Sequence, residues 1–390
     1  MAFSFADHKA PLLAGTVASI TGQAASTGVV LAAFTALGAS PTQIISVIFS
    51  MLLLFGTLSI VLSWRYKMPL SIVWSTPGAA LMVASGGLHF GFATAVGAFS
   101  FAAFMIALTG LWPALGRLVF SIPKPIASAM LAGVIFSFCI SPFKSLPDFP
   151  LIMAPVLIAW FVLYKYATVW ATPVAMVLLF TLSAIQFHVS VPVDQILPHV
   201  AFIVPQFSIP AIVSIGIPLY LVTMASQNIP GIAIMKSFGF EVPFRPVMIA
   251  TGIGSLLANF FGGYLANLAA ITAALNANEH AHKNPSRRWL ASVYGGVVYL
   301  ILAGATGAMI SFVIQQPHEI VLAGAGVALF GTIVGAFTTL VSEENLKLPA
   351  VIAFLVASSG LALASIGSAF WALLAGVMVW QFQALGRKKI

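Results

Sequence analysis

The sequence predicts an all-α integral membrane protein with about fourteen transmembrane segments, arranged as a 7+7 inverted repeat. Of the 390 residues, 61% are hydrophobic and only 6% are charged, whereas a soluble domain carries about 25% charged residues. The apolar runs are about 18 to 25 residues long and do not alternate with polar residues, which favours helices over a β-barrel. The basic residues also fall almost entirely on one side of the predicted spans.

The elements follow from the apolar runs and from the Gly, Pro and polar residues between them. The first run, from Leu12 to Leu37, is too long for the core of a signal peptide and lacks a basic leader, so we expect a true span. The predicted segments are 12–37, 42–64, 71–85, 90–112, 123–143, 148–164, 170–187, 210–235, 246–262, 266–280, 289–311, 319–341, 348–364 and 367–386.

The distribution of Lys and Arg predicts the orientation. If the N-terminus is cytoplasmic, all of the 16 basic residues except Lys144 fall on the inner side. The positive-inside rule then places both termini in the cytoplasm. We interpret the net charge of +8 as a topology signal and as lipid-headgroup contacts, not as a nucleic-acid footprint.

The third and tenth segments are interrupted. From Pro77 in one, or from Asn267 in the other, about ten apolar residues remain, which is enough for roughly 15 Å of helix. We therefore expect two half-helices, each preceded by a short extended stretch. Paired interrupted segments at corresponding places in two halves are typical of a transporter's binding site.

Both half-helices carry signals of a start near the middle of the membrane. Thr76 is expected as an N-cap, with Pro77 at the first helical position and Gly78 after it. Asn267 is expected as the second N-cap, followed by Leu268. Because no basic residue is predicted at mid-membrane, the free N–H groups and dipoles of the two helix ends are expected to form an anion site.

Two glutamines support the repeat. Gln23 in the first span and Gln227 in the eighth are each followed by small or helix-loosening residues, and in each half a whole span and then an interrupted one follow. We expect Gln23, Gln227 and Asn228 to form hydrogen bonds with a substrate; the alternative is that they bond to neighbouring helices. Tyr264 is expected to offer a ring face to an aromatic substrate.

Titratable residues are scarce in the predicted spans. Glu279 lies twelve residues beyond Asn267, near the predicted cytoplasmic end, and is the candidate for proton coupling; the alternative is an ion pair with Lys283 or Arg287. His280 and His282 lie in a polar loop without further ligands, so we expect no metal site and no cofactor. The only cysteine, Cys139, is expected to be an apolar packing residue.

Several of these motifs resemble the benzoate membrane transport family, the BenE-type benzoate/proton symporters. The resemblance covers essentially the whole chain and is carried by four stretches, namely 75–78, 227–231, 267–274 and the exit 279–289 with Arg287-Arg288-Trp289. It implies the fold of nucleobase–cation symporters and sulfate/bicarbonate-type anion transporters. In that fold, 12–115 and 210–312 form a core domain, 120–190 and 318–386 form a gate domain, and the substrate lies between them.

The sequence departs from the nucleobase carriers of this fold at two positions. Where those symporters carry glutamate in span 8 and before the span 10 asparagine, this chain has Gln227 and Ala266. The loss of two carboxylates removes charges that repel an anion, which disfavours a nucleobase substrate. It also removes the usual proton carriers of the fold.

We therefore expect a secondary active transporter of the bacterial inner membrane, and not an enzyme. It imports benzoate or a related small aromatic carboxylate with a proton, by alternating access. The alternatives are an uncoupled or exchanging anion transporter and a nucleobase symporter. The expected partners are the aromatic carboxylate, the proton and the lipid bilayer, with a homodimer expected from the fold and no nucleic acid.

Overall fold

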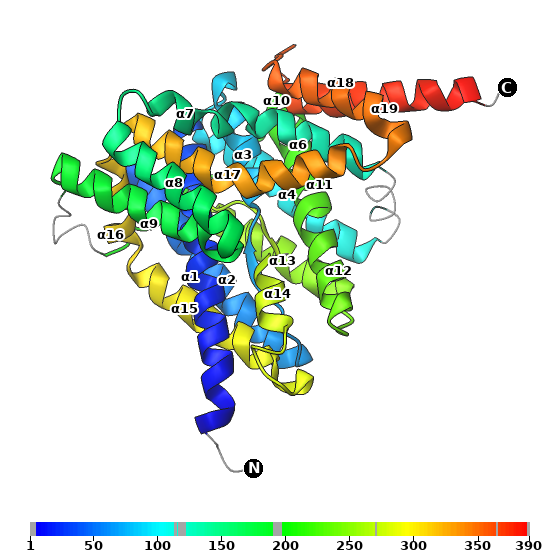
Figure 1. The fold of residues 1–390 in the computed structure, drawn as a ribbon. Coiled ribbons are helices and arrows are strands. Elements are labelled where there is room, and N and C mark those ends of the chain that lie inside the picture. Colours follow the sequence, from blue (N-terminus) through cyan, green and yellow to red (C-terminus); the bar gives the residue numbers. More distant parts are fainter. Residues whose placement is uncertain are drawn as a thin grey trace.

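The computed structural model describes residues 5–112, 115, 122–189, 197–269, 271–363 and 366–387, and most of these are helical (Figure 1). The first half contains the helices α1 (Phe5–Ala36), α2 (Pro41–Tyr66), α3 (Thr76–Ser85), α4 (Phe92–Leu111), α6 (Lys124–Cys139), α7 (Ser141–Ser145), α8 (Pro150–Tyr166) and α9 (Thr168–Phe187). The second half contains α10 (Ile209–Ala211), α11 (Ile217–Thr223), α12 (Ile229–Ser237), α13 (Phe244–Asn259), α14 (Ile271–Ala277), α15 (Trp289–Gly304), α16 (Thr306–Ile314), α17 (His318–Leu340), α18 (Lys347–Ser358) and α19 (Ser368–Arg387).

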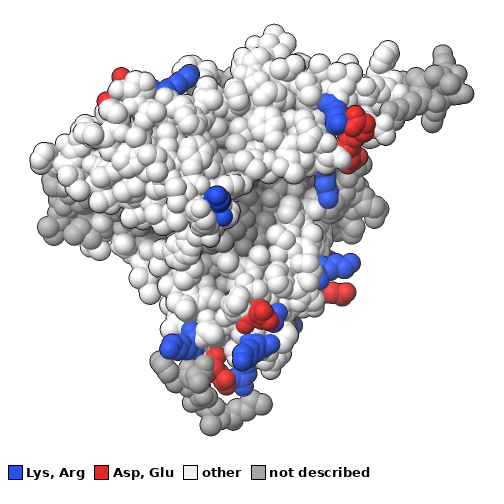
Figure 2. Space-filling view, in the orientation of Figure 1, with Lys and Arg blue, Asp and Glu red and all other residues white. Residues whose placement is uncertain are grey.

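The chain is a multi-pass membrane protein. Among the described residues, seven helices are long and apolar enough to cross a membrane, and an eighth candidate is the bent pair formed by α15 and α16. Figure 2 shows a mostly uncharged surface, on which the Lys, Arg, Asp and Glu side chains lie mainly at the lower end and along the edges, with one basic side chain near the middle of the face. Helices occupy all the segments predicted from the apolar runs, but the count of fourteen crossings stays a prediction.

Two predicted spans are not single straight helices. The span predicted over 289–311 bends by 60° between α15 and α16. The hydroxyl of Thr306 donates to the Ala303 carbonyl at 2.7 Å and thereby competes with the backbone ladder at the bend. The span predicted over 210–235 contains two π-helical turns, Ile212–Gly216 and Met224–Asn228.

An extended stretch precedes each of the two short helices, as expected, although the paired strands lie at 72–74 and 266–268 and not at the expected 74–75 and 263–265. Strand β1 (Ile72–Trp74) precedes α3, and strand β2 (Ala266–Leu268) precedes α14. The strands are antiparallel, with Val73 opposite Asn267. Because they run in opposite directions, α3 and α14 leave the pair at opposite ends, as Figure 1 shows. This extended backbone is buried inside the protein, where unsatisfied peptide groups find partners.

The structure corrects both predicted helix caps. The N-cap of α3 is Ser75, whose Oγ accepts a hydrogen bond from the Gly78 N–H at 3.0 Å, so Thr76 is the first helical residue. Asn267 is not a cap, because it lies in β2 and α14 begins only at Ile271. The pairing with β1 keeps residues 266–268 extended and delays the helix.

Helix α1 lies inside the molecule and packs against α3, α15 and α17. Its contact with α15 is close because Gly15 has no side chain: a Cβ there would lie 2.1 Å from the Ala291 carbonyl oxygen. Small residues at such crossings allow helix backbones to approach in a membrane protein. The result is that residues 21–26 of α1 lie beside both interrupted segments.

Candidate functional site

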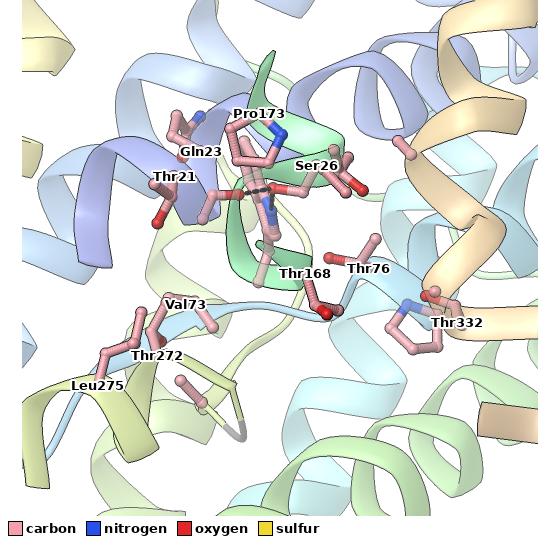
Figure 3. A pocket seen from close by; sticks show the side chains of 18 of the residues that line it. Thr21, Gln23, Ser26, Val73, Thr76, Thr168, Pro173, Thr272, Leu275 and Thr332 are labelled. Atoms are coloured by element: carbon pink, nitrogen blue, oxygen red, sulfur yellow. Dashed lines mark hydrogen bonds between the residues drawn. The ribbon is translucent and has the colours of Figure 1, made fainter. Parts of the chain in front are cut away.

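A cavity of about 350 Å³ lies between α1, the two interrupted segments and the helices α8, α9 and α17. Its size falls within the range of about 300 to 1,000 Å³ that is typical of small-molecule sites. Figure 3 shows threonine side chains from several of these elements around this space. The lining residues are Thr21, Gly22, Gln23, Ser26, Val73, Trp74, Thr76, Pro77, Trp160, Tyr164, Thr168, Ala171, Thr172, Pro173, Gln227, Ala269, Thr272, Leu275, Tyr299, Ala328, Gly331 and Thr332.

The wall formed by α1 carries Gln23 and Ser26. The Ser26 hydroxyl accepts a hydrogen bond from the Trp74 Nε1–H at 2.8 Å and donates to the Gly22 carbonyl at 2.7 Å. Phe55 packs edge-on against the Trp74 ring, with the ring centroids 5.5 Å apart. The indole of Trp74 is therefore held in one orientation at the cavity.

The start of α3 forms the next part of the wall. Pro77 has no N–H, the Gly78 N–H bonds to Ser75 Oγ, and the Ala79 N–H bonds to the Ser75 carbonyl at 2.8 Å. The Thr76 N–H has no hydrogen bond to the described residues. This amide and the positive end of the α3 dipole lie at the cavity, where they favour a negatively charged group.

The second π-helical turn supplies Gln227 to the cavity and Asn228 to the strand behind it. Asn228 is fully buried, and its Oδ1 accepts a hydrogen bond from the Leu268 N–H at 2.9 Å. The Gln227 side chain has no hydrogen-bond partner among the described residues. Isolated π-helical turns occur frequently at functional sites because they redirect side chains.

A further part of the wall comes from α8, α9 and α17. The rings of Trp160 and Tyr164 stack with centroids 4.7 Å apart and an angle of 15° between their planes. The Trp160 Nε1–H donates to the Thr172 hydroxyl at 3.2 Å, which joins α8 to α9. Thr332 of α17 completes this side. Aromatic rings and hydroxyl groups thus line this part of the cavity.

The cavity wall carries no formal charge. Among the described lining residues there is no Asp, Glu, His, Lys or Arg. Glu279 is exposed in the loop after α14 and does not line the cavity. The nearly buried Arg288 instead fixes the end of α14, because its Nη1 donates to the Ala277 carbonyl at 2.8 Å and its Nε to the His282 carbonyl at 2.9 Å.

The structure divides the sequence-predicted site residues into two groups. Gln23, Thr76, Pro77 and Gln227 line the cavity. The other five lie behind its wall, and they are Gly78, Asn228, Tyr264, Asn267 and Leu268.

Tyr264 illustrates the second group. It is fully buried, its ring stacks on Trp74 at a centroid distance of 6.5 Å, and its hydroxyl donates to the Ser75 carbonyl at 3.4 Å. Its position is therefore that of a support for Trp74 and for the α3 cap.

Sequence reasoning missed the wall formed by α8, α9 and α17. Two patterns there point to it in retrospect. Trp160 and Tyr164 are four residues apart on α8, and Thr168 and Thr172 are four residues apart on α9. Residues with this spacing share one helix face, so each pair marks a polar or aromatic stripe on an otherwise apolar helix.

Comparisons with known proteins identify the family of this chain. Residues 6–382 match the family described as the benzoate membrane transport protein, BenE. The chain belongs to the benzoate membrane transport family. One relative, the inner membrane protein YdcO of Escherichia coli, is 37% identical over 369 residues, which cover 94% of this chain and 93% of YdcO. Another is the benzoate membrane transport protein of Acinetobacter baylyi, 31% identical over 325 residues and 82% of each chain.

Solved structures of two anion transporters share the fold of this BenE-family chain. The transmembrane domain of the cyanobacterial bicarbonate transporter BicA superposes with a TM-score of 0.59 at 17% identity, covering 92% of this chain and 99% of that domain. Murine Slc26a9, an anion transporter in the inward-facing state, gives a TM-score of 0.57 at 14% identity, covering 99% of this chain and 70% of the mouse chain. At these identities the likeness shows the fold, and a likeness to nucleobase symporters stays an expectation.

Proposed function

We propose that this protein is a secondary active transporter that imports benzoate or a related small aromatic carboxylate. The observation that carries the proposal is the cavity itself, because it combines the start of α3 with aromatic rings, and none of its described lining residues is charged. An aromatic carboxylate consists of a negatively charged carboxylate and an apolar ring. The start of α3 matches the carboxylate, and the aromatic side chains of the cavity match the ring. The family relationship supports the same substrate class.

The carboxylate lies at the start of α3. Its oxygens accept hydrogen bonds from the Thr76 N–H and hydroxyl and from the Gln227 amide, with Gln23 as a further donor on α1. The α3 dipole supplies a positive field without a basic side chain. Asn228, Asn267 and Leu268 act indirectly in this proposal, since they hold the strand pair from which the two half-helices extend.

The ring of the substrate packs between two aromatic surfaces. Trp74 and Tyr299 both pack against Phe55, whereas Trp160 stacks on Tyr164, and all four of these ring residues line the cavity. Face and edge contacts between aromatic rings contribute about 0.5 to 1.5 kcal/mol beyond burial of their area. These rings therefore favour a benzoate over an aliphatic acid of the same charge.

Transport proceeds by movement of a core domain against a gate domain. The proposed core is 12–115 with 210–312, and the proposed gate is 120–190 with 318–386. This division is supported by the lining residues, since Thr76 and Gln227 belong to the core while Trp160, Thr168 and Thr332 belong to the gate. A substrate bound between two such bodies becomes accessible on either side as they move.

Import is coupled to a proton in this proposal. Because the described cavity wall has no carboxylate, the proton travels either on the substrate carboxylate or on Glu279. The protein resides in the bacterial inner membrane with both termini cytoplasmic, as the positive-inside rule predicts. A homodimer is expected by analogy with the fold alone.

A second candidate function is anion exchange or uncoupled anion transport. Two observations favour it, namely the uncharged cavity wall and the shared fold with BicA and Slc26a9, which are named as a bicarbonate and an anion transporter. It differs from the first candidate only in its driving force, so one assay separates them.

That assay is the uptake of radiolabelled benzoate into proteoliposomes, with and without an inward proton gradient. We expect accumulation driven by the gradient in the wild type and a loss of at least tenfold in Gln227→Ala. Uptake that is indifferent to the gradient selects the second candidate. Absence of benzoate uptake under every condition contradicts the substrate class.

A further inference from the structure

Three of the described residues that line the cavity are exposed at the protein surface. They are Tyr164 in the last turn of α8, Thr168 at the start of α9 and Gly331 on α17, whereas the other described lining residues are buried or partly buried. A Cβ on Gly331 would meet no atom within 4 Å, so the wall borders open space there. We call these three residues the mouth of the cavity.

Away from the mouth, the helices around the cavity are in contact. A Cβ on Gly28 of α1 would lie 3.1 Å from Met176 Cε of α9, and a Cβ on Gly324 of α17 would lie 3.4 Å from the same atom. Along their helices, Met176 and Gly324 lie about two turns from the mouth residues Thr168 and Gly331. In this conformation a ligand therefore reaches the cavity through the mouth.

One charged residue lies next to the mouth. Lys165 directly follows Tyr164, is exposed, and forms no ion pair with the described residues. It is the only Lys, Arg, Asp or Glu in the sequences of α8 and α9. Because neighbouring Cα atoms are about 3.8 Å apart and lysine has a four-carbon side chain, its ammonium lies within about 10 Å of the Tyr164 backbone. That distance is about one Debye length at 0.1 M salt.

An exposed cation outside an uncharged cavity acts mainly on the approach of an anion. The dipole at the start of α3 is effective only over its first turn, so it holds an anion that has already entered. A charge at the rim of a cleft acts over a longer range, raises the local concentration of the oppositely charged ligand and increases its association rate. Among the described lining residues no charge opposes this attraction.

We propose that Lys165 is an anion-capture residue, which attracts the substrate carboxylate to the mouth and thereby sets the rate at which it reaches the start of α3. The inference rests on the proposed function, since it assumes that the ligand of the cavity is an aromatic carboxylate. In the orientation that the positive-inside rule predicts, the mouth faces the cytoplasm, so Lys165 governs the binding of internal anion.

The test is stopped-flow binding of benzoate to the full-length protein in detergent. Intrinsic tryptophan fluorescence reports binding, because Trp74 and Trp160 line the cavity. The association and dissociation rate constants are measured from about 0.01 to 1 M salt, over which the Debye length falls from about 30 to 3 Å. For the wild type, we expect the association rate constant to fall at least fivefold over this range, because salt screens Lys165.

Variants of Lys165 assign this salt dependence to one side chain. At low salt, Lys165→Gln should lower the association rate constant by about threefold or more and remove most of its salt dependence, and Lys165→Glu should lower it by about tenfold. Lys165→Arg keeps the charge and should retain the wild-type rate constant. The dissociation rate constant should change by less than about twofold in all three variants.

Lys236→Gln is the matched control. Lys236 is exposed and lies in the last turn of α12, as Lys165 lies in the last turn of α8, so each substitution removes the same charge from a helix C-terminus. No residue of α12 lines the cavity in the described part of the chain. The association rate constant of this variant and its salt dependence are expected to match those of the wild type.

The outcomes separate the two claims. If benzoate binds to Lys165→Gln with the wild-type association rate constant, the inference is wrong and the proposed function stands. An equal loss in Lys236→Gln also overturns the inference, because the effect then comes from the net charge of the protein. A change confined to the dissociation rate constant overturns it as well, since Lys165 then contacts the bound ligand. If no aromatic carboxylate binds to the wild type, the proposed function and the inference both fail.

Discussion

At the scale of single residues, the site depends on which polar groups are satisfied and which are free. Asn228 and Gln227 are neighbours on one π-helical turn, yet Asn228 is fully buried and bonded to β2 while Gln227 lines the cavity. The sequence predicted that both are important because polar residues are rare in an apolar span. It could not distinguish their roles, because the hydropathy of the sequence does not reveal the π-helical turn on which both residues lie.

Replacement of Asn228 tests its role as a support. Asn228→Leu leaves the Leu268 N–H buried without a partner, so we expect a loss of stability of about 1 to 3 kcal/mol. The measurement is the thermal unfolding midpoint in detergent. Ser226→Ala on the same turn is the control, since its hydroxyl only bonds the Val222 carbonyl of its own helix. Equal unfolding midpoints for Asn228→Leu and the wild type would show that the bond to β2 is not needed.

Thr272 gives the opposite expectation. Because its hydroxyl is buried without a partner, Thr272→Val removes an unsatisfied group and keeps the shape of the side chain. The empty protein should be as stable as the wild type or more stable. Thr251→Val, which removes a buried hydroxyl that donates to the Val247 carbonyl at 2.9 Å, should lower the unfolding midpoint. A drop for Thr272→Val as large as that for Thr251→Val contradicts the description of Thr272 as a free group.

At the scale of elements, the strand pair organises the site. The interruptions at 71–85 and 266–280 were evident from Pro, Gly and Asn residues inside short apolar runs, and an extended stretch before each helix was predicted correctly, although the strands lie at 72–74 and 266–268. The pairing of β1 with β2 joins residues almost two hundred positions apart, as in Val73 opposite Asn267. Local sequence patterns cannot predict a contact between such distant residues. Asn267 therefore resembled a helix cap, although its pairing with β1 keeps it extended and α14 begins only at Ile271.

The first two residues of α3, Thr76 and Pro77, line the cavity directly after the Ser75 cap. Ser75→Ala removes the acceptor of the buried Gly78 N–H, and loss of an N-cap costs about 0.5 to 2 kcal/mol. We expect benzoate affinity to fall by about fivefold or more because the start of α3 frays. Ser85→Ala, at the other end of the helix, is the control. Unchanged benzoate affinity in Ser75→Ala would show that benzoate binding does not depend on the α3 cap.

At the scale of the whole molecule, the cavity lies where helices from distant parts of the chain meet. The sequence predicted one wall, because half-helices carry recognisable start signals. The wall from α8, α9 and α17 was missed, since its Thr and aromatic residues look like ordinary membrane-helix residues until the fold brings them beside α3. The three-dimensional fold, and not the local sequence, decides which of the many aromatic residues of this chain line the cavity.

A cross-link between the two bodies tests the proposed movement. A Cβ on Gly28 of α1 would lie 3.6 Å from the backbone nitrogen of Ala325 on α17, so the two helices are in contact at this point. In a Cys139→Ser background, oxidised Gly28→Cys/Ala325→Cys protein should lose at least tenfold of its benzoate uptake and regain it on reduction. Each single-cysteine variant is the control. Full uptake by the cross-linked protein would show that α1 and α17 do not move apart during transport.

The central claim is that the cavity at α3 binds an aromatic carboxylate, and its most direct test is a crystal structure with para-bromobenzoate. The anomalous signal of the bromine locates the ring, and the density locates the carboxylate. We predict the ring between Trp74 and Trp160, with the carboxylate within hydrogen-bonding distance of the Thr76 N–H and Gln227. Bromobenzoate bound outside this cavity, or with its carboxylate directed away from α3, would contradict the account.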